Sequence, residues 1–111
     1  MIDKIELENV LDMLTELENI LRKSHVEHFL VKNVDYCISV VSSCLDDPKT
    51  YNEIGLGRLS KILYPPHGGI TDVRVENDRD SFENLVNNLW AVLYKWDLMR
   101  RKAAPDNSKL T

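Results

Sequence analysis

Leucine and valine recur at alternating intervals of three and four residues along the first segment of the chain, from about Asp3 to Lys23. Five positions carry this pattern: Leu7, Val10, Leu14, Leu17 and Leu21. Such spacing gathers the five side chains on one face of an α-helix, whereas the two-residue period of a strand would scatter them over both faces of a sheet. The segment therefore predicts an amphipathic helix whose broad apolar face is buried against other elements.

The same period continues from about Ser24 to Leu45 and predicts a second helix. Ser24 followed by Glu27 has the spacing of a capping box, so Ser24 is the expected N-cap. The β-branched run over 37–41 favours a strand on local propensity alone. The helical period on both sides of this run favours a helix, and the short turn before it predicts antiparallel packing against the first helix.

A third helix is expected from Tyr51 to about Leu63, with Asp47 as its N-cap and Pro48 at the first helical position. Gly55 and Gly57 each weaken this helix by roughly 1 kcal/mol relative to alanine. They either allow another backbone to approach closely or mark a break into two short helices. A proline pair then ends the helix, because proline disfavours the α conformation in the residue before it.

The alternation of apolar and polar residues over 70–75 predicts a short strand or an extended strap over the core. The last helix is expected to begin with Asp80 or Ser81 as its cap. Its predicted buried stripe comprises Phe82, Leu85, Val86, Leu89, Trp90, Leu93, Trp96 and Met99. With 111 residues the chain is long enough for one domain, expected over 1–102 with a flexible tail over 103–111. The predicted fold is an all-α bundle of four main helices, with an irregular Pro/Gly loop and a short extended strap before the last helix.

The sequence offers little catalytic chemistry. Cys37 and Cys44 lie two helical turns apart, roughly 10.5 Å, which is too far for a disulfide, so we expect two buried thiols. His25 and His28 lack the further ligands that a zinc site needs. Because no nucleophile motif, phosphate-binding loop or dinucleotide fingerprint occurs, we expect no catalytic residues, no cofactor and no metal. An enzyme would need a cleft near Tyr64, His67 and Asp72.

Charge is the more informative feature. The chain has 18 acidic and 14 basic side chains, and its net charge of −4 argues against a nucleic-acid partner. Glu8, Asp12 and Glu16 follow one another at intervals of four residues, on the side of the first helix away from its apolar stripe. A second acidic set comprises Asp72, Glu76, Asp78 and Asp80. These sets are either solvated surface or a negative surface that attracts a basic partner.

Two further features concern the cellular location. No apolar run approaches the roughly 20 residues of a membrane-spanning helix. The charged segment at the start of the chain is unlike a secretory signal. We therefore expect a cytoplasmic protein without a membrane partner.

The loop between the third and fourth expected helices has the sequence LYPPHGGITD over 63–72. It resembles the YPPxGG signature of a small bacterial domain family of unknown function, whose members are short helical proteins with this loop before the last helix. The chain has His67 where that family has arginine, and Val73 where it has an aromatic residue. The resemblance implies a structural role for the matching loop residues, which are Tyr64, Pro65, Pro66, Gly68 and Gly69.

The chain is also similar to the immunity proteins of bacterial toxin–immunity systems, including contact-dependent growth inhibition, which are small, acidic and cytosolic. This similarity implies a protein that is not an enzyme and that neutralises a cognate toxin, a basic nuclease, by occluding its active site. The two acidic sets are the expected partner-binding residues, and the chain is expected to be a monomer or a weak homodimer. The alternative is a helical protein-interaction or oligomerisation module without a toxin partner.

Overall fold

The computed structural model describes residues 2–24, 28–47, 49, 51–65, 69–73, 75 and 79–103. Among these residues, helices are the regular secondary structure, and no strand is present. The elements in chain order are α1 (Lys4–Lys23), α2 (His28–Asp46), α3 (Glu53–Gly57), α4 (Leu59–Leu63), the 3-10 helix η2 (Ile70–Asp72) and α5 (Arg79–Ala103). The all-α prediction is therefore confirmed.

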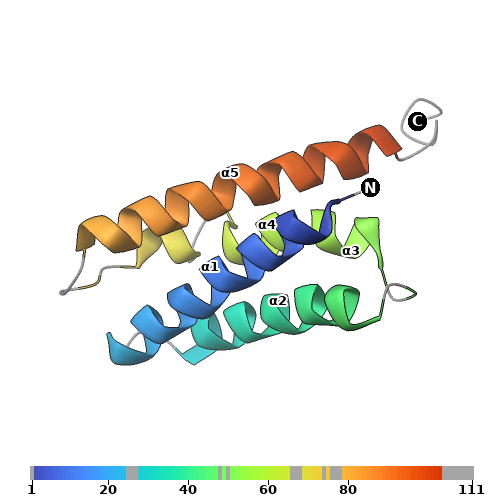
Figure 1. The fold of residues 1–111 in the computed structure, drawn as a ribbon. Helices are drawn as coiled ribbons and strands as arrows, with labels where there is room; N and C mark the ends of the chain where they lie inside the picture. The colour runs from blue at the N-terminus through green and yellow to red at the C-terminus, as the bar shows by residue number, and fades with distance from the viewer. Residues whose placement is uncertain are drawn as a thin grey trace.

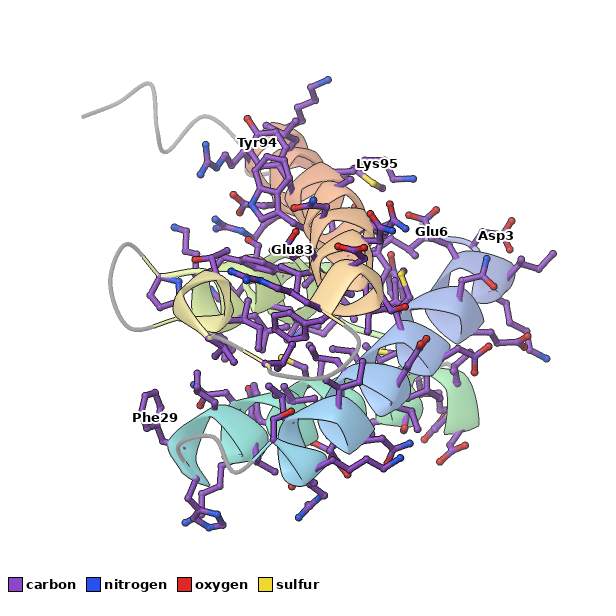
Figure 2. All side chains as sticks on the ribbon, turned by 90° about the vertical axis from the view of Figure 1, so that its left-hand side faces the viewer. Asp3, Glu6, Phe29, Glu83, Tyr94 and Lys95 are labelled. Atoms are coloured by element: carbon purple, nitrogen blue, oxygen red, sulfur yellow. The ribbon has the colours of Figure 1, made fainter. Side chains whose placement is uncertain are left out.

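The three long helices lie along one another, and α1 runs antiparallel to both α2 and α5 (Figure 1). The two short helices α3 and α4 follow one another and pack against α5 and α2. Figures 1 and 2 show that α1 lies on one side of the layer made by α2 and α5, and that α3 and α4 lie on the other side. All five apolar positions that predicted α1 are buried in the shared core.

Ser24 does not begin the second helix, contrary to the capping-box prediction. It is the C-cap of α1, where its backbone N–H donates to the carbonyl of Leu21. Its hydroxyl donates to the Ile20 carbonyl at 2.8 Å. A serine side chain can bond a carbonyl four residues back as readily as an amide ahead of it, and here it closes the preceding helix. Glu27, the other half of the predicted box, lies outside the described residues.

The third expected helix is divided into α3 and α4 at Arg58, so the break left open by its glycines is present. The N-cap is Asn52, whose Oδ1 accepts from the backbone N–H groups of Ile54 and Gly55 at 3.1 Å each. The prediction of Asp47 as the N-cap of this helix is wrong, because α3 begins only at Glu53; the carboxylate of Asp47 accepts instead from the N–H of Lys49. Pro48 lies outside the described residues.

The described residues of the strap before the last helix, 70–73 and 75, contain no strand. Ile70–Asp72 forms a single 3-10 turn, and extended backbone follows at Val73. Ile70 and Val75 are buried, so the segment covers the core as expected but with a different backbone. The last helix begins at Arg79, so Asp80 and Ser81 lie within its first turn and do not cap it.

The two tryptophans of α5 were both predicted to be buried, but only one of them is. Trp96 is fully buried, but Trp90 is 44% exposed and the prediction that it belongs to the buried stripe is wrong. The Trp90 ring stacks on that of Tyr94, with centroids 4.9 Å apart. Trp90 lies at the edge of the apolar face of α5, where a neighbouring ring four residues later covers part of it.

The Pro/Gly loop is anchored by Tyr64, whose hydroxyl donates to the Val86 carbonyl of α5 at 2.7 Å. Burial raises the pKa of this phenol, which stays protonated and able to donate. Gly69 is buried with φ −94°, which lies outside the left-handed region that favours glycine. Pro66, His67 and Gly68 lie outside the described residues.

Close packing, and not backbone strain, requires glycine at position 69. A Cβ there would lie 2.5 Å from Pro65 Cδ and 3.0 Å from the Leu63 carbonyl oxygen. We expect Gly69→Val to lower the free energy of unfolding by about 1–3 kcal/mol through overpacking. Urea unfolding followed by circular dichroism measures this. A variant that unfolds at the same urea concentration as the parent would show that the loop does not pack rigidly on α4.

Candidate partner-binding surface

The orientation of α1 is fixed by contacts that reach it from α5. The buried indole of Trp96 donates from Nε1 to Glu6 Oε1 at 2.7 Å, and Lys95 Nζ lies 2.7 Å from the same oxygen. At the start of the helix, the Asp3 carboxylate caps α1 by accepting from the N–H of Ile5. Together these contacts hold the apolar stripe of α1 against the core and turn the opposite face outward.

The outward face carries the first predicted acidic set. Glu8, Asp12 and Glu16 are all exposed, as the sequence predicted. Glu8 is partly offset, because Lys4 Nζ lies 3.9 Å from Glu8 Oε1. Both side chains of this pair are more than half exposed, and ion pairs that are so exposed contribute little to the free energy of folding. Within the described part of the chain, neither Asp12 nor Glu16 has an ion-pair partner.

Ile5 is a member of this surface that the sequence reasoning did not single out. This residue is 65% exposed, the most of any large apolar residue described. It precedes Glu8 by three residues and Asp12 by seven, so it lies on the same face of α1. The sequence did contain a signal for this exposure, because Ile5 falls outside the apolar stripe that begins at Leu7. The outward face of α1, defined here as Ile5, Glu8, Asp12 and Glu16, therefore combines an exposed apolar side chain with a row of carboxylates.

The second acidic set is only partly within the described residues. Asp80 is exposed in the first turn of α5. Asp72 is the last residue of η2, but its side chain is not among the described parts of the structure. Glu76 and Asp78 lie outside the described residues. The grouping of these four carboxylates thus stays a prediction.

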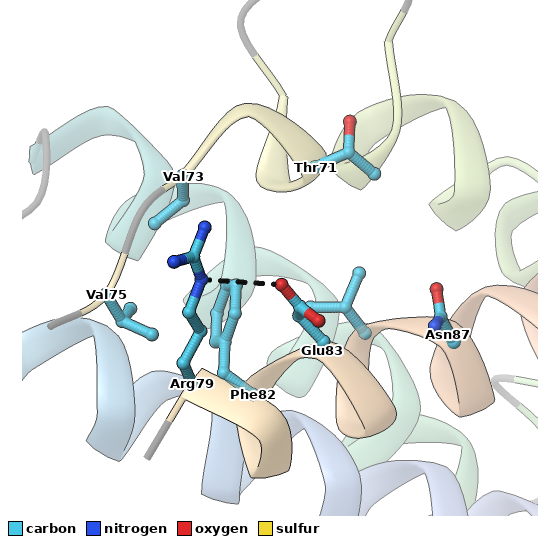
Figure 3. Close-up of a pocket in the computed structure, with 8 residues that line it drawn as sticks. Thr71, Val73, Val75, Arg79, Phe82, Glu83 and Asn87 are labelled. Atoms are coloured by element: carbon cyan, nitrogen blue, oxygen red, sulfur yellow. Dashed lines mark ion pairs between the residues drawn. The ribbon is translucent and has the colours of Figure 1, made fainter. Parts of the chain in front are cut away.

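A cavity of about 450 Å³ lies between the strap and α5 (Figure 3). Val75, Phe82 and Val86 supply apolar walls, and the exposed Arg79 and Glu83 form an ion pair at 3.6 Å beside them. None of the eight lining residues is a cysteine, histidine or buried carboxylate, which are the groups that most often act as nucleophile or base. The enzyme alternative relied on His67, which lies outside the described residues.

The two cysteines are buried and are not joined to each other by a disulfide, as predicted. Burial raises the pKa of Cys37 to about 12, so its thiol is protonated at neutral pH and a poor nucleophile. Over the described ranges, no group of three or more histidine, cysteine and acidic side chains is placed to hold a metal ion.

One buried carboxylate stands apart from the acidic surface. Asp97 of α5 is 3% exposed and lies among cations. Its Oδ1 accepts from Arg100 Nε at 3.1 Å and Nη2 at 2.7 Å, and its Oδ2 lies 2.8 Å from Arg101 Nη2. Burial alone would raise the pKa of Asp97, but the hydrogen bonds from Arg100 and the charges of Arg101, Arg100 and Lys61 outweigh it and hold the pKa below its ordinary value.

The described helices include none that is both long and apolar enough to cross a membrane. No family model matches the chain, and neither a curated protein nor a solved structure is significantly similar to it.

Proposed function

We propose that this chain is an immunity protein that binds a cognate bacterial toxin, a basic nuclease, and occludes its active site with the outward face of α1. The observation that carries the proposal is the row of exposed carboxylates at Glu8, Asp12 and Glu16. Successive members lie about 6 Å apart along the helix axis. A regular line of negative charge resembles the phosphate backbone that a nuclease binds with lysine and arginine side chains.

Ile5 supports a protein partner over a purely solvated surface. Protein interfaces place an apolar contact at the centre and polar groups around it. On α1 an isoleucine that is mostly exposed has carboxylates one, two and three turns further along the same face. Contact of Ile5 with the toxin would exclude water, and the carboxylates would steer the approach and select a basic partner.

Expression of the chain together with the protein encoded beside it tests this function. We expect the two to purify as a stoichiometric complex, and we expect added chain to inhibit the toxin's nuclease activity in proportion to its amount. A complex in which the neighbouring enzyme stays fully active would favour the helical interaction module. Failure to bind or inhibit would contradict the immunity function.

A further inference from the structure

A second groove, of about 520 Å³, opens where α2, α3, α4 and the end of α5 meet, on the side of the molecule away from α1. Its walls combine apolar and cationic side chains: Tyr36, Ile54, Ile62, Arg58, Lys61 and Arg100. The volume is within the range of about 300–1,000 Å³ that is typical of small-molecule sites. The chain as a whole is acidic, so a groove lined by three cations departs from its average charge.

The positive charge of this groove is incompletely neutralised. Arg58 and Lys61 are exposed, and no carboxylate of the described residues lies within ion-pair distance of either. The carboxylate of Asp97, which holds the lining residue Arg100, already has both oxygens engaged by Arg100 and Arg101. Three cations and no carboxylate are among the residues that line the groove, and this balance of charge favours an anionic ligand.

Arg100 is fixed before any ligand arrives. Two of its nitrogens bond to Asp97 Oδ1, and its side chain is mostly buried while still lining the groove. A guanidinium held in this way binds a phosphate oxygen with little further loss of side-chain entropy. Arg58 and Lys61 supply two more cations around the same space.

The remaining walls are suited to a ring. Tyr36 is 54% exposed and Ile54 is 55% exposed, although both residues are large and apolar. An aromatic ring system that lies against them would remove this surface from water. We propose that this groove binds a small phosphate monoester attached to an aromatic ring, with the phosphate at Arg58, Lys61 and Arg100 and the ring against Tyr36 and Ile54.

Calorimetric titration of the full chain with adenosine monophosphate, adenosine and inorganic phosphate tests this inference independently of any toxin. We expect saturable binding of the monophosphate, with adenosine and phosphate each about tenfold weaker because each lacks one half of the contacts. The double variant Arg58→Ala with Lys61→Ala should bind the monophosphate about tenfold more weakly and should bind adenosine as tightly as the parent does. Tyr36→Ala should weaken the binding of both the monophosphate and adenosine and should leave the binding of inorganic phosphate unchanged.

Lys23→Ala, which removes an exposed cation from the end of α1, is the matched control and should bind like the parent. The substituted side chains at positions 36, 58 and 61 are exposed, so circular dichroism should show parental folding in each variant. Absence of saturable binding, inorganic phosphate that binds as tightly as the monophosphate, or equal losses in the Lys23→Ala control would each overturn the proposal. A single-stranded oligonucleotide that binds far more tightly than the monophosphate would also overturn it, in favour of a nucleic-acid site.

Discussion

Asp97→Ala is expected to lower the free energy of unfolding by about 3 kcal/mol, in the range for loss of one partner from a buried ion pair. The carboxylate is almost fully buried and bonded to both Arg100 and Arg101. Its removal leaves the largely buried Arg100 without a counter-charge near Lys61. Urea unfolding of the parent and the variant measures the difference. Asp80→Ala, which removes an exposed carboxylate from the same helix, should change stability by less than about 0.5 kcal/mol.

The same carboxylate gives a pH dependence with a defined sign. The pKa of Asp97 in the folded chain lies below its ordinary value, so the contribution of Asp97 to stability is present above the unfolded-state pKa of about 3.9. It is lost as the pH falls through the lower, folded-state pKa. Asp97→Asn cannot titrate, so its stability deficit should be largest near neutral pH and should shrink below about pH 4. A deficit that stays constant from pH 7 to strongly acidic solution would contradict the account of the Asp97 cluster.

Gly57→Val is the second substitution with a large expected effect, again about 3 kcal/mol of destabilisation. A Cβ at position 57 would lie 2.6 Å from Arg100 Cβ and 3.1 Å from the Trp96 carbonyl oxygen. These atoms belong to the body of α5 and cannot move aside without separating α3 from α5. The substitution should therefore lower the thermal midpoint and the urea midpoint together.

Gly55 provides a matched control two residues away on the same short helix. A Cβ there would meet the Asn52 side chain at 3.4 Å, which is ordinary contact. Gly55→Ala should leave stability unchanged or raise it by up to about 1 kcal/mol, because alanine restricts the unfolded chain, whereas Gly57→Ala should still destabilise, because its Cβ meets α5. Equal losses at the two positions would indicate a general effect of helix propensity, and would contradict the packing argument for Gly57.

The long helices were predictable because periodicity over many residues outweighs local ambiguity. The stripe from Leu7 to Leu21 predicted both the extent of α1 and the face that it buries. The β-branched run over 37–41 was assigned to a helix on the same grounds, and it lies within α2. Exposure of Glu8, Asp12 and Glu16 followed from their placement opposite the stripe.

Features that depend on partners distant in the sequence were not predictable in this way. The capping pattern at Ser24 is a different case, because serine can end one helix or begin the next, and here its N–H and hydroxyl bond to the carbonyls of Leu21 and Ile20. The need for glycine at position 57 arises from Arg100, 43 residues later, and no local pattern contains that contact. Likewise, the cationic groove joins Arg58 and Lys61 to Arg100 from another helix, so the average acidity of the chain concealed it.

The rate of association with the toxin is the most direct test of the role of α1. Simultaneous Glu8→Lys, Asp12→Lys and Glu16→Lys substitutions should slow association about tenfold or more near 0.02 M salt and less at 0.15 M, because salt screens exposed charges. Asp46→Lys, Asp47→Lys and Glu83→Lys change the net charge by the same amount at exposed positions outside both acidic sets, and this control should slow association much less. Slowing confined to the α1 variant is the predicted result. Equal slowing in both variants, or none in either, would contradict the claim that the outward face of α1 meets the partner.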